Sequence, residues 1–119
     1  MLPRASRLNA SGDFRTTIRR GTRVGRPTLV LHAGERRDGV GVRVGFVVSK
    51  AVGNAVVRNR VKRRLRHLAA EQVSAVHARD PGPAGVDVVV RALPAAASAG
   101  DQLRTDLAGA WAKAWTRLS

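Results

Sequence analysis

The stretch that decides the fold runs from Arg43 to Arg66 and reads RVGFVVSKAVGNAVVRNRVKRRLR. Its first part alternates bulky apolar residues with small or polar ones, which is typical of a strand with two different faces. The bulky face carries Val42, Val44, Phe46 and Val48, and the other face carries Gly41, Arg43, Gly45, Val47 and Ser49. We therefore expect residues 40–49 to form a strand whose second face has room for a ligand.

A helix is expected soon after this strand, from Ala55 to about Val76. Gly53 and Asn54 mark a turn, and the Asn54 side chain is suited to cap the helix. At 100° per residue the apolar side chains form one narrow stripe, made of Val57, Val61, Leu65 and Leu68. Most of the remaining circumference is polar or basic, with Asn59, Arg60, Lys62, Arg63 and Arg66. One face of this helix should pack against the sheet, and the other should be basic.

The other elements follow from shorter patterns. Residues 11–21 predict a short amphipathic helix, because Ser11 can cap it and Phe14 and Ile18 are four residues apart. Residues 28–32 are expected to form a strand antiparallel to residues 40–49, with a charged turn at 35–39. Residues 86–91 predict a strand after a loop at 80–85. A closing helix is expected to begin with a capping box of Ser98 and Asp101 and to run toward residue 118.

Length and composition favour one small domain. The chain of 119 residues suffices for a single modest core, so residues 1–119 are interpreted as one domain. There is no cysteine, which excludes disulfides and thiol nucleophiles. No apolar run reaches the ~18 residues of a membrane span, and the amino terminus carries scattered arginines instead of an apolar signal core. The cytoplasm is therefore the expected location.

The charge is strongly one-sided. Lys and Arg total 22 against 8 Asp and Glu, which gives a formal net charge of +14, and all but three of the basic residues are arginine. No acid lies between Asp38 and Glu71, although that segment contains eight basic residues. An ordinary exposed helix face mixes both signs, so this pattern predicts an anionic partner. Guanidinium groups suit the phosphates of a nucleic acid.

No catalytic residue and no metal ligand is expected in this chain. The histidines at positions 32, 67 and 77 are scattered, and none lies beside an acid at ligand spacing. The acids fall mostly at expected turns and helix starts, where solvated or capping roles explain them better than a metal-dependent nuclease site. The sequence has neither a GxSxG elbow nor a phosphate-binding loop.

Few aromatic side chains are available to stack on bases. They are Phe14, Phe46, Trp111 and Trp115, and both tryptophans fall on the apolar face of the closing helix. Phe14 is the best candidate for stacking, although packing of its helix onto the sheet explains it equally well. Contacts to a nucleic acid should therefore be mostly to phosphate and sugar.

Residues 43–66 closely resemble the defining segment of the bacterial ribonuclease P protein component. A strand ending in Val-Ser-Lys, a Gly-Asn turn and the motif Arg58-Asn59-Arg60 stand in the order that this family shows. Weaker similarity includes Asp13 and Phe14 in the first helix and extends to the last strand and helix. Two positions depart from the family pattern: Ala51 replaces a basic residue and Ile18 replaces an aromatic one.

The resemblance implies the fold in more detail. It implies a small two-layer α+β domain with a mostly antiparallel sheet of four strands and with three helices, in the order αβββαβα. It also implies a left-handed β-α-β crossover around the basic helix, whereas general rules favour a right-handed one. A fourth strand is then expected near residues 23–25.

The resemblance also implies a function. Ribonuclease P is a ribozyme that cleaves precursor tRNA to form the mature 5′ end, and its RNA subunit, with the substrate, holds the catalytic Mg²⁺. In this family the open sheet face and basic helix bind the single-stranded 5′ leader, and the Arg-Asn-Arg region binds the catalytic RNA. The residues then expected to contact RNA are Phe14, Arg43, Ser49, Lys50, Asn54, Arg58, Asn59, Arg60, Lys62, Arg63 and Arg66. Neither a membrane nor an obligate protein partner is expected.

Two alternatives stay open at this point. A ribosomal or other structural RNA-binding protein would show the same basic helix and the same lack of an active site. A protein-only nuclease would have to cut precursor tRNA with Mg²⁺ in the absence of RNA, and the scattered acids argue against it.

Overall fold

The computed structural model describes residues 2–78 and 84–118. Three helices and four strands follow one another as α1 (Ser11–Arg20), β1 (Thr22–Gly25), β2 (Leu29–Val40), β3 (Val42–Val47), α2 (Ala55–His77), β4 (Ala84–Ala92) and α3 (Gln102–Leu118). Two short 3-10 helices, η1 (Arg4–Ser6) and η2 (Pro94–Ser98), precede α1 and α3. The order of helices and strands is the expected αβββαβα, and β1 confirms the strand expected near residues 23–25.

The four strands form one mixed sheet in the order β1-β2-β4-β3. The β1–β2 and β2–β4 pairs are antiparallel, whereas β3 and β4 are parallel neighbours connected through α2. The sheet is therefore mostly antiparallel, as expected. The left-handed sense of the β3-α2-β4 crossover stays a prediction.

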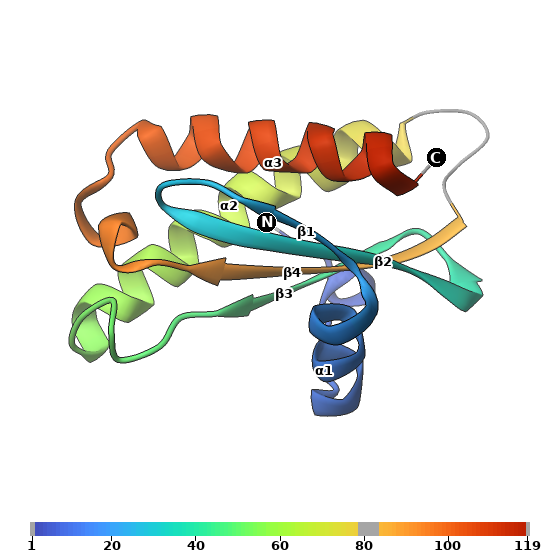
Figure 1. The fold of residues 1–119 in the computed structure, drawn as a ribbon, viewed down its shortest axis with the longest axis horizontal. Helices are drawn as coiled ribbons and strands as arrows, with labels where there is room; N and C mark the ends of the chain where they lie inside the picture. The colour runs from blue at the N-terminus through green and yellow to red at the C-terminus, as the bar shows by residue number, and fades with distance from the viewer. Residues whose placement is uncertain (1, 79–83, 119) are drawn as a thin grey trace.

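The helices lie on opposite faces of the sheet. Helices α2 and α3 cover one face, and α1 stands on the other (Figure 1). The apolar side chains of alternate strand positions meet α2 and α3 in a core that includes Leu31, Val88, Leu65, Leu107 and Trp111. Trp111 is buried on the apolar face of α3, as expected, and it stacks on Trp115 with ring centroids 4.8 Å apart. No described helix is long and apolar enough to cross a membrane.

Strands β2 and β3 run antiparallel, as expected, because β4 is antiparallel to β2 and parallel to β3. They are not hydrogen-bonded to each other, because β4 lies between them and pairs with both. The charged residues of the turn expected at 35–39 belong instead to the end of β2, where the register with β4 shifts between Glu35 and Val40. The reversal lies at residues 39–41, where Gly39 and Gly41 adopt φ of 77° and 82°. Only glycine takes these values without strain, so these two glycines, not the charges, mark the turn.

Two further expectations concern the carboxy-terminal half. Residues 79–83 of the expected loop at 80–85 lie outside the described residues, and β4 already begins at Ala84. The expected capping box is wrong, because Ser98 ends η2 and α3 begins four residues later at Gln102. Pro94 stands at the start of η2, where its fixed φ suits a tight turn. The Asp101 carbonyl then accepts a bond from the Thr105 amide at 3.2 Å.

Candidate nucleic-acid interface

Helix α2 presents a basic face because its apolar face is buried. Its first turn is capped by Asn54, whose side-chain oxygen accepts a hydrogen bond from the Val57 amide at 3.0 Å. The buried side of its first half consists of Val61, Leu65 and Leu68, with Val57 packed partly against the core. The expected stripe is therefore confirmed. The exposed side contains Asn59, Arg60, Arg63 and Arg66.

The Arg-Asn-Arg motif occupies the beginning of α2. Asn59 and Arg60 are exposed, whereas Arg58 is half-buried. The Nε atom of Arg58 is buried and has no hydrogen-bond partner within the described parts of the chain. Of the neighbouring arginines, Arg64 approaches a carboxylate, that of Asp101, at 3.7 Å. The motif thus offers guanidinium groups at the start of a rigid helix, which suits bidentate contact to phosphates.

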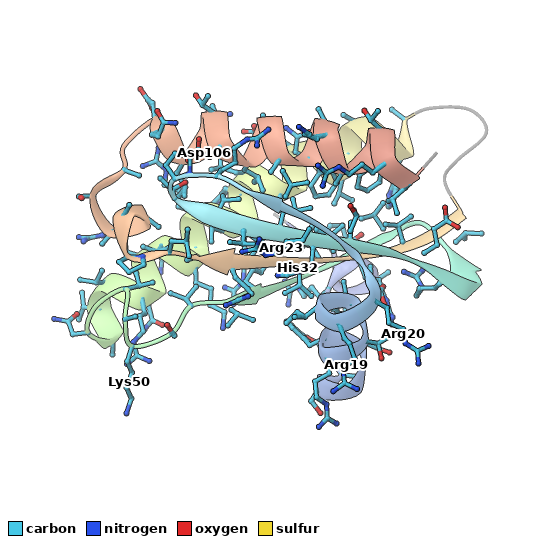
Figure 2. All side chains as sticks on the ribbon, viewed as in Figure 1. Arg19, Arg20, Arg23, His32, Lys50 and Asp106 are labelled. Atoms are coloured by element: carbon cyan, nitrogen blue, oxygen red, sulfur yellow. The ribbon has the colours of Figure 1, made fainter. Side chains whose placement is uncertain are left out.

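A tight turn holds Ser49 and Lys50 at the exit of β3. The Val52 amide donates to the Ser49 carbonyl at 3.1 Å, and the Gly53 amide donates to the Lys50 carbonyl at 3.2 Å. Val52 is buried beneath the turn, so Ser49 and Lys50 are exposed above it. Lys50 projects from one end of the molecule, away from α1 (Figure 2). The Lys50 side chain therefore lies apart from α1 and from the face of the sheet on which α1 stands (Figure 2).

A cavity of about 260 Å³ connects α1, β3, α2 and the amino-terminal segment. Phe14 lies against Gly45 of β3, and a Cβ atom on Gly45 would overlap the Phe14 ring. Lys62 and Arg66 of α2 line the same cavity. Gly45, one of the small residues on the strand face that was expected to have room for a ligand, is therefore in contact with the Phe14 ring. The cavity combines that ring with two cations, a pair of groups suited to a base and its phosphates.

Arg43 is engaged within the protein. Its Nε and Nη2 atoms donate to the two carboxylate oxygens of Asp87, each at 2.8 Å, and Nη2 also approaches Asp13 at 3.3 Å. Arg36 donates to the same Asp87 at 2.7 Å. The hydrogen bonds to Asp87 raise the pKa of Arg43 above its ordinary value. These four residues help line a cavity of about 620 Å³ between α1 and the sheet.

Two acids differ from the solvated roles expected of them. Asp87 lies in the middle of β4 and is buried between the arginines of β2 and β3. Asp106 is buried in α3, where it accepts bonds from the Thr28 hydroxyl at 2.6 Å and the Gln102 amide at 2.7 Å. Burial alone would raise the pKa of Asp106, but these hydrogen bonds outweigh it and lower the pKa. Both acids fix elements of the fold, a role that a turn pattern does not reveal.

A basic row on the open sheet face escaped the sequence analysis. His32 of β2 stands opposite Arg23 of β1 (Figure 2). Arg91 of β4 stands opposite Val30, two residues before His32. Leu31 faces the core, so His32 faces the side of α1. Strand alternation around Leu29 and Leu31 could have placed His32 on this face.

The His32 ring is unusual because it is buried without partners. It is 2% exposed, and neither ring nitrogen forms a hydrogen bond in the described structure. Burial lowers the pKa of His32, and the charges of Arg91 and Arg23 lower it further. The ring is therefore neutral at physiological pH, with polar atoms that no described side chain satisfies.

The sequence-derived residues thus fall into three groups. Phe14, Lys62 and Arg66 meet around one cavity, Ser49 and Lys50 lie at the strand exit, and Arg58, Asn59, Arg60 and Arg63 lie along α2. Asn54 caps that helix, and Arg43 belongs to the Asp87 cluster. In residues 2–78 and 84–118, no three His, Cys, Asp or Glu side chains are placed to hold a metal ion.

Known proteins resemble this chain along most of its length. The family model described as Ribonuclease P matches residues 2–115. The ribonuclease P protein component of Nocardioides sp. is 56% identical over 101 residues, covering 83% of this chain and 81% of the relative. That of Kocuria rhizophila is 51% identical over 120 residues and covers 100% of both chains.

Solved structures show the same fold. A Staphylococcus aureus RNase P protein mutant with defective mRNA degradation activity has a TM-score of 0.80 at 27% identity, covering 92% of this chain and 88% of that one. The RNase P protein from Thermotoga maritima has a TM-score of 0.73 at 21% identity, covering 90% of this chain and 96% of that one. The second likeness concerns the fold alone.

Proposed function

The chain belongs to the ribonuclease P protein family, and from this premise we propose that it acts as the protein subunit of the ribonuclease P ribozyme. Its function is the maturation of the tRNA 5′ end, with the catalytic RNA as its partner and the cytoplasm as its place of action. The alternative of a ribosomal or other structural RNA-binding protein gains no support from the family match.

The observation that carries the detailed proposal is the cavity around Phe14. An aromatic ring lies against Gly45, and Lys62 and Arg66 of α2 face the same space. Single-stranded nucleic acids are bound by stacking platforms combined with basic grooves. We therefore assign this cavity to the single-stranded 5′ leader of precursor tRNA. Ser49 and Lys50 extend the leader surface at the strand exit.

The catalytic RNA is assigned to the start of α2. Arg58, Asn59 and Arg60 lie between one and two turns beyond the Asn54 cap, on an element that is fixed by its buried apolar side. Guanidinium groups held on such a helix clasp phosphates through paired hydrogen bonds. Arg63 continues the same exposed face. This surface and the leader cavity are the two parts of the proposed interface.

The protein contributes binding, and the chemistry is proposed to belong to the RNA. Asp87 accepts hydrogen bonds from two arginines, and Asp106 accepts them from a threonine and a glutamine of the same fold. We propose that Mg²⁺ is held by the RNA subunit and the substrate, where it supplies the activated water. The residues of this chain bind and orient the leader beside that centre by neutralising its phosphates.

A single-turnover cleavage assay tests this division of labour. RNA subunit alone, protein alone and holoenzyme are compared at low and at high Mg²⁺. Mg²⁺ ions can neutralise part of the phosphate charge that the basic residues of the protein would otherwise neutralise. The RNA alone should therefore cleave at high Mg²⁺ and need the protein at low Mg²⁺. The protein alone should not cleave. Cleavage by RNA-free protein, or equal protein dependence at both concentrations, would contradict the proposal.

A further inference from the structure

An exposed side of α1 carries a basic stripe that the proposed interface does not use. Its members stand at positions i, i+3, i+4, i+7 and i+8 of the helix and are Gly12, Arg15, Thr16, Arg19 and Arg20. They line a groove of about 360 Å³ by themselves, without a residue from another element. A Cβ atom at Gly12 would meet nothing within 4 Å, so this end of the groove is open.

The three arginines of the stripe carry uncompensated charge. All three are exposed, and among the described residues no hydrogen bond or ion pair engages their guanidinium groups. The acid of α1, Asp13, is directed to Arg43 at 3.3 Å. The helix dipole favours cations in the last turn, which accounts for Arg19 and Arg20 but not for Arg15. Like charges at this spacing repel one another, so an anionic partner would stabilise the stripe.

The position of α1 distinguishes this stripe from the basic face of α2. Helix α1 stands on the sheet face opposite α2 and α3, and Arg19 and Arg20 project from it into solvent (Figures 1 and 2). The stripe begins next to the leader cavity in the chain, since Phe14 lines the cavity and Arg15, the next residue, projects about 100° further around the helix. A strand that leaves the Phe14 ring and passes around α1 would therefore meet Arg15 and then, one turn further on, Arg19.

From this geometry we infer that the stripe on α1 binds the phosphates of the upstream part of a long 5′ leader, beyond the part held in the Phe14 cavity. The inference rests on the proposed function. The stripe from Gly12 to Arg20 spans about 12 Å at 1.5 Å per residue, which is long enough for more than one phosphate. It contains arginine and a hydroxyl but no aromatic side chain. The contact is therefore to the backbone and independent of base sequence.

Binding of two precursors to the holoenzyme tests the inference. They share one tRNA body, and one leader ends within the Phe14 cavity whereas the other extends well beyond it. The double variant Arg15→Ala and Arg19→Ala should weaken binding of the long leader about tenfold and leave the short one within about twofold. Each lost single-strand phosphate contact lowers the slope of log affinity against log salt by about 0.7, so the long leader should lose about 1.4.

The control is the double variant Lys113→Ala and Arg117→Ala, which removes the same charge from exposed positions of α3. It should leave both affinities and both salt slopes unchanged. Thermal melts of both variants establish that they are folded. The inference is overturned if the α1 variant leaves the long leader unaffected, or weakens long and short leaders equally. If the α1 variant bound the isolated RNA subunit more weakly, in the absence of any precursor, the stripe would belong to the contact with that RNA. This result would also overturn the inference.

This outcome is separable from that of the proposed function. The proposed function requires that a precursor with the short leader binds the wild-type holoenzyme better than mature tRNA does. If that preference persists while the α1 variant changes nothing, the leader cavity stands and the stripe has no role. If the preference is missing in the wild type, the leader cavity itself is wrong, and the inference falls with it.

Discussion

Asp87 is the residue on which the open face of the sheet most depends. Its carboxylate accepts hydrogen bonds from Arg36 of β2 and Arg43 of β3, and it is itself part of β4. The Asp87 side chain is only 8% exposed, so the pairs are shielded from water. Arg43 therefore has a structural partner in addition to the RNA contact expected of it.

Replacing Asp87 by Asn should destabilise the protein strongly. The change removes the Asp87 carboxylate from Arg36 and Arg43, and breaking a buried pair costs about 3 to 5 kcal/mol. We expect a value near the lower end, because Arg43 retains 30% exposure. Urea denaturation measures the change in unfolding free energy. The matched control is Glu71→Ala, which breaks the exposed 2.6 Å pair with Arg104 and should cost less than about 1 kcal/mol. Equal effects would mean that Asp87 has no special role.

His32 should make the stability depend on pH. Burial and two nearby arginines lower the pKa of His32 in the folded protein below the ordinary 6.5. At any pH between this lowered pKa and 6.5, the unfolded chain therefore binds more protons than the folded one. The unfolding free energy should therefore fall as the pH decreases through 6.5 and continue to fall until the folded-state pKa is reached. Denaturation of wild type and His32→Leu between pH 8 and 5 measures this effect. The variant should show a flatter profile, and parallel profiles would contradict the assignment.

Among the elements, those defined by local patterns were predictable from the sequence. Asn54 followed by an apolar stripe places α2 correctly, because capping and helical periodicity depend on neighbours within four residues. The same pattern placed Arg60, Arg63 and Arg66 in solvent, and the structure confirms their exposure. The predicted helix at residues 11–21 and the strand at 86–91 are likewise confirmed.

Elements that depend on distant partners were not predictable in the same way. The sequence could not show that β4 inserts between β2 and β3, because that pairing joins residues about fifty positions apart. Nor could it show that Asp87 would meet Arg36 and Arg43, since those pairs form only when three strands are in register. The identity of the ring that lies on Gly45 depends in the same way on how α1 docks.

The packing of α2 has a direct test. Leu65 is fully buried, and Leu65→Ala should destabilise the fold by about 2 to 5 kcal/mol through lost burial and a cavity. The control in the same helix is Val56→Ala, because Val56 is 73% exposed. It should change the unfolding free energy by less than about 0.5 kcal/mol. Thermal or urea denaturation decides the matter, and a negligible effect at Leu65 would mean that the faces of α2 are reversed.

At the scale of the whole molecule, the proposed RNA contacts form two adjoining surfaces that share α2. The α2 surface begins just beyond the Asn54 cap, whereas the Phe14 cavity lies between α1, β3 and the middle of α2. The net charge of +14 favours the approach of RNA to both surfaces, and the proposal assigns each its own partner from the arrangement of the elements. We propose that the cavity recognises the leader and that the start of α2 recognises the catalytic RNA.

The most direct test is the ratio of the dissociation constants for mature tRNA and leader-bearing precursor, measured on holoenzymes with Phe14→Ala or Arg60→Ala. Loss of a stacked ring costs about 1 to 3 kcal/mol, so Phe14→Ala should lower the ratio at least fivefold and leave assembly with the RNA subunit intact. Arg60→Ala should weaken assembly and leave the ratio unchanged once the complex is saturated. If both variants changed the ratio equally, the account of two separate surfaces would be contradicted.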